Sequence, residues 1–437
     1  MDPARRHLLI ALGTGSAAAL AGCIGRGSDT ETTGESAKLL PAEGDAMDLF
    51  GESVALSADG GVAVVGADQG HPSDEEPGAA YIFERTDGEW RETATLTDEN
   101  GEPGDDFGGS VALSADGRTA LVGADNDTLA SGNVAGSATV FEREDGWSQR
   151  ATFTPDDGEN QSEFGVSMPV SLSADGQTAL LGAPAEADPN GEEAGAAYVY
   201  RRQDGTWDQP EKMFPEDGSP FDDFGAAVSL AADGTTAVVA APEAGPPNGE
   251  PGIAYVFNAD GGEWPQRARL RPPTGQDEQG FAASVAVSAD GTTVLVGAWT
   301  AGESLLSFGS GWVYVFEREN GGWTNTDRLV PSDGEAGSDT DWFGETVALA
   351  DDGATAVVGA PNDHALGGGA GSAYVFERDG DWWTQRAKLA ASDGGTADEL
   401  GRSVAVSGDG STALAGAHDD GNENGDQAGA AYVFEAW

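Results

Sequence analysis

Basic residues and cysteine are scarce in this chain of 437 residues. Lysine and arginine together number 21, against 76 aspartates and glutamates, which gives a formal net charge of −55. Because almost nothing basic is available to follow a phosphate backbone, the composition argues against a nucleic-acid partner. An acidic disordered chain is one alternative, but the regularly spaced valine, leucine, phenylalanine and tryptophan residues favour a folded protein.

The acidic residues occur along the whole chain and do not form a single tail. We interpret them as a solvated shell, which indicates adaptation to very high salt, as in extreme halophiles. At 1 M salt the Debye length falls to about 3 Å, so repulsion between neighbouring carboxylates is strongly screened.

Residues 1–22 have the pattern of an export signal. Arg5 and Arg6 precede a weakly apolar run, residues 10–20, which is too short to span a bilayer. The arginine pair resembles a twin-arginine export signal. Residues 20–23, Leu-Ala-Gly-Cys, resemble a lipobox, in which cleavage before the cysteine leaves its thiol to carry lipid.

Cys23 is the only cysteine and therefore has no partner for an internal disulfide. An ordinary export signal with an incidental cysteine is the alternative to a lipid anchor. Residues 23–36 are rich in glycine, serine, threonine and acidic residues, which predicts a flexible tether spanning about 20 Å. The sequence thus predicts an extracellular protein that is attached to the cell membrane through lipid alone.

One stretch of sequence occurs seven times. Residues 107–124 read as two short strands joined by an Asp-Gly turn, since apolar positions alternate before the turn and form a short run after it. Repeats of fixed period that bury a shared core form one domain. The copies begin 57 to 62 residues apart, at Phe50-Gly51, Phe107-Gly108, Phe164-Gly165, Phe224-Gly225, Phe281-Ala282, Phe343-Gly344 and Leu400-Gly401.

Each repeat holds four apolar runs, and their distribution along the chain predicts a closed ring. The last repeat stops after its third run, and residues 37–40 supply a fourth run at the other end of the chain. An amino-terminal strand that completes the last sheet leaves no open edge, whereas an open solenoid would need capping repeats. We therefore predict an all-β fold for residues 37–437: a seven-bladed β-propeller of four-stranded antiparallel blades, closed by the amino-terminal strand.

The motif Phe-Gly-Xaa-Ser-Val-Ala, followed by Gly-Ala-Pro as at residues 182–184 and 359–361, resembles the FG-GAP repeats of integrin α subunits. The resemblance covers residues 37–437 and implies a propeller. Integrin-type repeats often bind Ca²⁺ through an aspartate-rich loop between the first two strands. Here that connection is as short as residues 57–60, and its single Asp59 cannot supply the several oxygens that Ca²⁺ requires. The calcium sites of the family are not carried over.

Loops on one face of the predicted propeller are candidates for ligand binding. The loops between second and third strands are longer and more varied than the tight turns of the opposite face, and the integrin resemblance implies the same face. Residues 299–308 are apolar where the equivalent loops are acidic, so Trp299, Leu305, Leu306 and Phe308 are candidate ligand-binding residues. The alternative is that these side chains pack beneath the loop and close the centre of the ring.

Histidines in the same loops are candidate metal ligands. His71, His364 and His418 belong to the first, sixth and seventh repeats, which are neighbours in a closed ring, and Asp419 follows His418. Imidazole and carboxylate suit transition metals, although chance placement in long loops is the alternative. Clustered carboxylates in the connections between repeats, as at residues 98–106 and 333–341, are candidates for Ca²⁺.

Common catalytic motifs are missing from the sequence: it contains no Gly-Xaa-Ser-Xaa-Gly elbow, no cysteine in the repeats and no His-Glu-Xaa-Xaa-His. We therefore expect no enzymatic activity. The sequence predicts a monomeric binding or adhesion module at the cell surface, with a protein or glycan as its ligand. The alternatives are an extracellular propeller enzyme acting on polysaccharide, as a hydrolase or lyase, and a purely structural surface protein.

The charge of the chain predicts that its stability depends on salt. Transfer from molar NaCl to dilute buffer should lower the melting temperature, because the carboxylates of the shell then repel one another without screening. Thermal melts across a series of NaCl concentrations measure this dependence. A melting temperature that does not change with salt would contradict the prediction.

Overall fold

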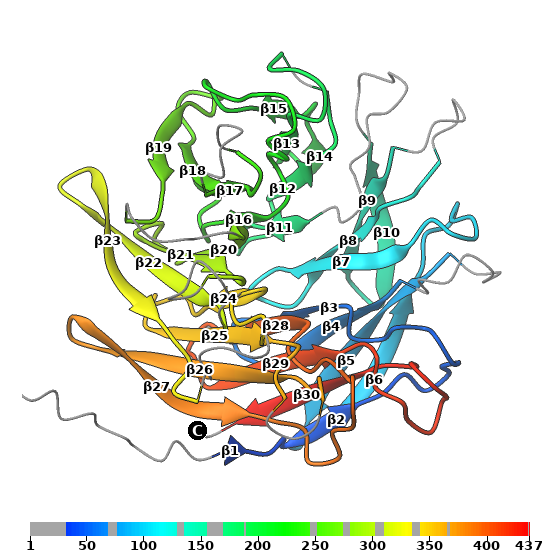
Figure 1. The fold of residues 1–437 in the computed structure, drawn as a ribbon. Coiled ribbons are helices and arrows are strands. Elements are labelled where there is room, and N and C mark those ends of the chain that lie inside the picture. The colour runs from blue at the N-terminus through cyan, green and yellow to red at the C-terminus, as the bar shows by residue number, and fades with distance from the viewer. Residues whose placement is uncertain are drawn as a thin grey trace, which may run out of the picture.

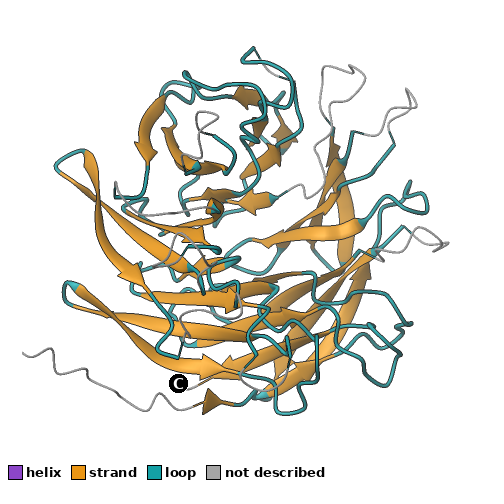
Figure 2. Ribbon diagram, in the orientation of Figure 1, coloured by secondary structure: helices purple, strands orange, loops and turns teal. Residues whose placement is uncertain are grey.

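The computed structural model describes residues 32–68, 77–128, 135–154, 169–187, 189–244, 251–273, 280–301, 310–333, 341–364, 368–435 and 437. Within these ranges the regular structure consists of strands alone, joined by loops and turns (Figure 2). None of the described residues forms a helix of the length and hydropathy needed to cross a membrane. The strands form seven sheets, each a blade of a propeller (Figure 1). The predicted fold class is confirmed.

Each blade is an antiparallel meander, and the first strands of adjacent blades contact one another around the centre. Blade 1 consists of β3 (Ser53–Leu56), β4 (Val62–Ala67), β5 (Ala79–Thr86) and β6 (Glu89–Leu96). Blade 2 consists of β7 (Phe107–Leu113), β8 (Thr119–Ala124), β9 (Ser137–Arg143) and β10 (Trp147–Phe153). Blade 3 consists of β11 (Val170–Leu172), β12 (Thr178–Ala183), β13 (Ala196–Gln203) and an outer strand in two pieces, β14 (Thr206–Trp207) and β15 (Glu211–Met213).

The remaining blades follow the same order from the centre outwards. Blade 4 consists of β16 (Val228–Leu230), β17 (Thr236–Ala241), β18 (Ile253–Asn258) and β19 (Gln266–Leu270). Blade 5 consists of β20 (Phe281–Val287), β21 (Thr293–Ala298), β22 (Trp312–Glu319) and β23 (Gly322–Leu329). Blade 6 consists of β24 (Val347–Leu349), β25 (Thr355–Ala360), β26 (Ser372–Asp379) and β27 (Trp382–Leu389). Blade 7 consists of β28 (Ser403–Val406), β29 (Thr412–Ala417), β30 (Ala430–Glu435) and β2 (Ala37–Leu39).

The amino-terminal strand closes the ring as predicted. β2 pairs antiparallel with β30, with Lys38 opposite Tyr432, and Figure 1 shows the blue β2 beside the red β30. Upstream of β2, residues 32–33 form β1, which pairs parallel with β27 of blade 6. This short strand lies inside the segment expected to be a tether. The predicted signal, with Arg5, Arg6 and Cys23, lies outside the described residues.

A second ring of contacts runs around the centre, through the turns between first and second strands. In each turn one backbone amide donates a hydrogen bond to the carbonyl oxygen of the equivalent residue in the next blade, at N···O distances between 2.9 and 3.2 Å. The seventh bond, from Gly408 to Ala58, returns to the first blade, so the chain of bonds is closed. The participating residues, in order, are Ala58, Ala115, Ala174, Ala232, Ala289, Asp351 and Gly408.

The Phe-Gly motif joins adjacent blades. Phe50 is fully buried and packs edge-to-face on Tyr81 of its own blade, within a cluster that includes Val433 of blade 7. Gly51 has a φ of +101°, and a Cβ there would overlap the carbonyl oxygen of Ala430. The motif thus supplies a large apolar side chain for the interface and a backbone conformation that favours glycine.

The Ser and Gly-Ala positions complete the same interface. The hydroxyl of Ser53 donates a hydrogen bond of 2.7 Å to the carbonyl oxygen of Gly108 in blade 2. Gly66 lies against the same carbonyl, where a side chain would not fit. The equivalent bond from Ser403 to Gly51, at 2.8 Å, joins blade 7 to blade 1. The repeated motif is therefore explained by packing between blades.

The three lysines of the chain occupy one repeat position in the outer strands. Lys38, Lys212 and Lys388 each lie over a tyrosine ring of the third strand, at 5.0 to 5.4 Å from the ring centroid. Each also forms a salt bridge to at least one acidic side chain, as Lys388 does to Asp363 at 2.6 Å. The lysines thus act as cross-links between strands and loops.

Gly66→Ala should destabilise the propeller by about 1–3 kcal/mol, because the added methyl group overlaps the backbone of the next blade. Denaturant unfolding at constant high salt measures the loss. Gly146→Ala is the control, since a Cβ at Gly146 would have no atom within 4 Å. Equal stability of the two variants would contradict the packing explanation of the Gly-Ala position.

Candidate functional site

Three positions of each repeat meet at the inner edge of one face, the face that carries the loops between second and third strands. We call this the variable face. The three positions are the residue before the Phe of Phe-Gly, the residue after Phe-Gly, and the residue after Gly-Ala. Within the described residues they meet because the backbone at the second position of Phe-Gly pairs with the backbone at the first position of Gly-Ala, as when the amide of Gly51 donates to the carbonyl oxygen of Gly66 at 2.9 Å. The motif of blade 3 lies outside those residues. We call them the mouth positions.

The mouth positions differ in chemistry from blade to blade, while the scaffold around them repeats. Blades 6, 7, 1 and 2 carry most of the charged side chains, and blades 3 to 5 carry mainly alanine, proline and glycine. The residues before the motif are Leu49, Asp106, Asp223, Gly280, Trp342 and Glu399. The residues after Phe-Gly are Glu52, Gly109, Ala226, Ala283, Glu345 and Arg402. The residues after Gly-Ala or Ala-Ala are Asp68, Asp125, Pro184, Pro242, Trp299, Pro361 and His418.

Arg402 of blade 7 links the blades on either side of it. Its guanidinium group lies 3.1 Å from Glu52 of blade 1 and 2.6 Å from Glu345 of blade 6. Burial raises the pKa of Glu345, and the charge of Arg402 only partly offsets that effect. Burial also acts to raise the pKa of Glu52, but the hydrogen bond from His418 and the charge of Arg402 outweigh it and lower that pKa. The ion pairs therefore hold three blades together at the mouth.

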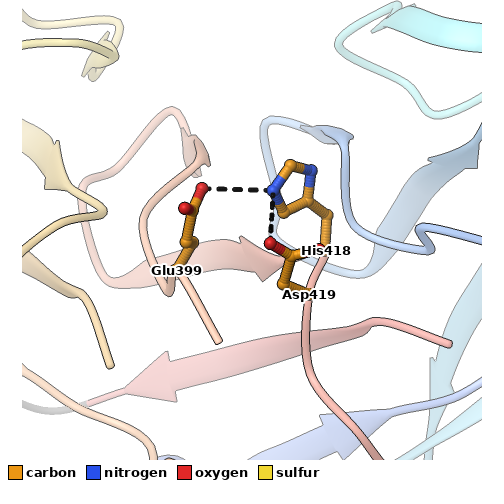
Figure 3. A group of neighbouring side chains, drawn as sticks. All are labelled: Glu399, His418 and Asp419. Atoms are coloured by element: carbon orange, nitrogen blue, oxygen red, sulfur yellow. Dashed lines mark hydrogen bonds and ion pairs between the residues drawn. The ribbon is translucent and has the colours of Figure 1, made fainter. Parts of the chain in front are cut away.

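His418 lies at the centre of a group of carboxylates (Figure 3). Its Nδ1 is hydrogen-bonded to Glu52, while its Nε2 lies 3.2 Å from Glu399 and 3.7 Å from Asp419. Burial by itself would lower the pKa of His418, but the hydrogen bonds to Glu399 and Glu52 and the charge of Glu52 raise it to about 10. The imidazole is therefore protonated at neutral pH in the absence of another cation.

Asp68 adds a buried acidic group next to this cluster. Burial, together with the charges of Glu52, Asp106 and Asp125, raises the pKa of Asp68 to about 7. Within the described part of the chain, the Oδ1 atom of Asp68 is buried without a hydrogen-bond partner. The mouth at blades 7, 1 and 2 thus concentrates negative charge in a partly dehydrated place.

Two tryptophans occupy mouth positions in the neighbouring blades 5 and 6. Trp299 of blade 5 packs edge-to-face on Trp342 of blade 6, with 5.8 Å between ring centroids and an interplanar angle of 88°. Both rings are half-buried, so Trp299 is neither fully exposed nor sealed beneath its loop. Leu305, Leu306 and Phe308, the other candidates from this loop, lie outside the described residues.

Of the histidine candidates, the structure describes His364 and His418, and these two do not share a group of candidate metal ligands. In the described ranges, the group of metal-binding side chains with ligand atoms within 4.8 Å of one another is Glu399, His418 and Asp419. His364 is exposed on blade 6 and is not in that group. His71 lies outside the described residues.

Several residues of the mouth were missed by the sequence reasoning, among them Glu52, Trp342, Glu345, Glu399 and Arg402. A signal for three of them, Glu52, Glu345 and Arg402, exists in the sequence. When the seven copies are aligned position by position, the residue after Phe-Gly changes from alanine or glycine to Glu or Arg only in repeats 1, 6 and 7, apart from a valine in the third. Variation at one position of an otherwise uniform repeat marks these residues.

The repeat model for FG-GAP repeats matches seven segments: residues 33–83, 90–141, 147–200, 207–257, 264–316, 323–376 and 383–434. The chain belongs to the FG-GAP repeat family. Each match begins near the outer strand of one blade and ends in the third strand of the next, so the FG-GAP unit and the blade are offset by one strand. None of the curated proteins compared with the chain matches it.

The calcium loop of the integrin-type FG-GAP repeat does not fit this chain. In the turn between β3 and β4, the carboxylate of Asp59 accepts hydrogen bonds from the Ser57 hydroxyl at 2.7 Å and from the Gly61 amide at 3.0 Å. The equivalent Asp116, Asp175, Asp290 and Asp409 accept the same pair of bonds in their blades. These carboxylates therefore cap the turns of the scaffold.

Asp223 at the mouth of blade 4 gives a prediction of pH dependence. Burial and the charges of Glu243, Glu193 and Asp222 raise its pKa to about 6. The folded state therefore holds this proton more tightly than the unfolded state, and ionising Asp223 costs stability as pH rises from about 4 to about 6.

Asp223→Asn should remove that cost. Asparagine also tolerates the positive φ of 55° found at this position. The melting temperature of the variant, relative to the unchanged protein, should rise between pH 4 and pH 6 and stay constant above it. Thermal melts at constant salt measure the difference, and a difference that does not depend on pH would contradict the assignment.

Proposed function

We propose that the chain is a non-catalytic binding or adhesion module, which binds a protein or glycan ligand through the mouth of its variable face. In the same proposal the propeller is exported and held outside the cell by lipid on Cys23. The FG-GAP propeller is consistent with a binding role. The class of ligand and the lipid anchor are proposals.

One observation carries the proposal: the mouth positions are the places where a uniform ring departs from its repeat. Where the structure describes them, the phenylalanines of the motif are buried and its glycines lie against the backbone of neighbouring strands, so these positions serve packing. In contrast, blades 1, 6 and 7 carry Glu52, Glu345 and Arg402 after Phe-Gly, where blades 2, 4 and 5 carry glycine or alanine. Blades without these charges form the same scaffold, so the gathering of charge in one place, beyond the ion pairs of Arg402, is best explained by a ligand.

The chemistry of the mouth fits the proposed ligand classes. Carboxylates accept hydrogen bonds from sugar hydroxyls and pair with basic side chains of a protein. The half-buried rings of Trp299 and Trp342 offer apolar surface of the kind that sugar rings and protein side chains pack against.

The experiment compares the mouth with the opposite face. The full chain is immobilised in molar salt and exposed to surface proteins and polysaccharides prepared from a halophile's cell envelope. The mouth variant carries Glu345→Gln and Trp342→Ala. The control variant carries Asp145→Asn and Asp381→Asn, which neutralise exposed acidic residues in turns between third and fourth strands, on the face away from the mouth.

We expect the unchanged protein and the control to retain the same ligand and the mouth variant to lose affinity at least about tenfold, which corresponds to about 1.4 kcal/mol. Retention of the ligand at unchanged affinity by the mouth variant would contradict the proposal. Release of new reducing ends or unsaturated sugars from the polysaccharide fraction would favour the enzyme alternative.

A further inference from the structure

We infer that His418, Glu399 and Asp419 form a binding site for a divalent transition-metal ion of the Zn²⁺ type. The site would add a metal centre to the mouth, and it can be tested without any ligand. It keeps His418 and Asp419 from the set expected from the sequence and adds Glu399, whereas His364 is exposed and outside the group.

The first argument is the spacing of the ligand atoms. Nε2 of His418 lies 3.2 Å from Oε2 of Glu399 and 3.7 Å from Oδ2 of Asp419. A tetrahedral ion with ligand bonds of about 2.0–2.2 Å places its ligand atoms roughly 3.3–3.6 Å apart. The observed distances bracket that range, so small side-chain rotations would be enough to bind the ion.

The second argument is that the backbone positions are firmly held. His418 directly follows β29, whose last residues are buried, and Asp419 is the next residue. Glu399 precedes Leu400, which is fully buried between blades 6 and 7. The ligands are therefore carried by backbone that adjoins buried positions, and Figure 3 shows their side chains turned toward one another.

The third argument is the partner of the second imidazole nitrogen. Nδ1 of His418 is hydrogen-bonded to Glu52, which comes from blade 1. Metal-binding histidines usually donate the nitrogen that faces away from the metal to a carboxylate, which fixes the tautomer and the ring orientation. With Nδ1–H donated to Glu52, a bound ion would replace the proton on Nε2 of His418, on the side of Glu399 and Asp419.

The carboxylate of Glu52 is itself held in place. Arg402 lies 3.1 Å from Glu52 and 2.6 Å from Glu345 of blade 6. Residues from blades 6, 7 and 1 thus fix the orientation of the imidazole. Glu52 acts as a positioning residue and does not contact the ion.

The ligand set also distinguishes between metals. One imidazole and two carboxylates suit a transition metal, whereas Ca²⁺ takes 6–8 oxygen ligands. Three protein ligands leave a position open for water or for an oxygen atom of a bound molecule. The side chains are accessible enough for exchange, with exposed fractions of 13% for His418, 25% for Glu399 and 23% for Asp419.

The test measures Zn²⁺ binding by the full chain after treatment with chelator. Calorimetric titration is run in molar NaCl with excess Mg²⁺, so that the acidic shell is saturated with other cations. We expect about one tightly bound Zn²⁺ per chain. Co²⁺ in place of Zn²⁺ should give a visible absorption band whose intensity reports four-coordination.

Matched variants locate the ion. His418→Gln should abolish the stoichiometric binding, whereas His364→Gln, at the exposed histidine of the neighbouring blade, should leave it unchanged. Glu52→Gln should weaken binding roughly 10- to 100-fold without abolishing it, as expected of a positioning residue. If His418→Gln fails to fold, the double variant Glu399→Gln and Asp419→Asn takes its place.

The absence of stoichiometric Zn²⁺ binding would overturn the inference, as would binding that survives in folded His418→Gln or in the double variant. Neither result bears on ligand capture by the mouth, because that experiment uses different residues. Conversely, a protein that binds Zn²⁺ at this site but captures no ligand would support the metal site. The same result would contradict the proposed function.

Discussion

The closed circle of backbone hydrogen bonds at the centre of the ring is the constraint on which the other features depend. Each blade donates to one neighbour and accepts from the other, and the bond from Gly408 to Ala58 joins the last blade to the first. The pairing of β2 with β30 closes the ring a second time at its outer edge. Because both closures are made by backbone groups, they hold whatever side chains the loops carry.

The site at the mouth is a product of this closure. Glu52 and His418 are 366 residues apart in the sequence, yet their side chains are hydrogen-bonded. Arg402 reaches Glu345 and Glu52 from the blade between them. An open ring would separate blade 7 from blade 1 and leave the imidazole without its carboxylate partner.

Much of the fold could be predicted from the sequence because the repeat gives the same information seven times. The Phe-Gly motif, the alternating strands and the outer strand found at the amino-terminal end, residues 37–40, were enough to predict the number of blades and the way the ring closes. The short β1 at Thr32–Thr33 was missed, since two residues carry no periodicity of their own.

The candidate site was predicted only in part, for a physical reason. His418 and Asp419 could be selected by residue type, but Glu399 and Glu52 look like any of the other acidic residues. Their role depends on which blades are neighbours and on how the inner strand ends converge. Trp299 was expected either on the surface or beneath its loop, and it lies between the two because Trp342 packs against one side of it.

The stability of two truncated chains tests the closure most directly. A chain of residues 35–437 keeps β2, whereas a chain of residues 41–437 lacks it. Closure by β2 predicts that the longer chain unfolds cooperatively near the melting temperature of the full chain. The shorter one should melt at a lower temperature and recover when a peptide of residues 35–41 is added. Equal melting temperatures for the two chains, with no effect of the peptide, would contradict it.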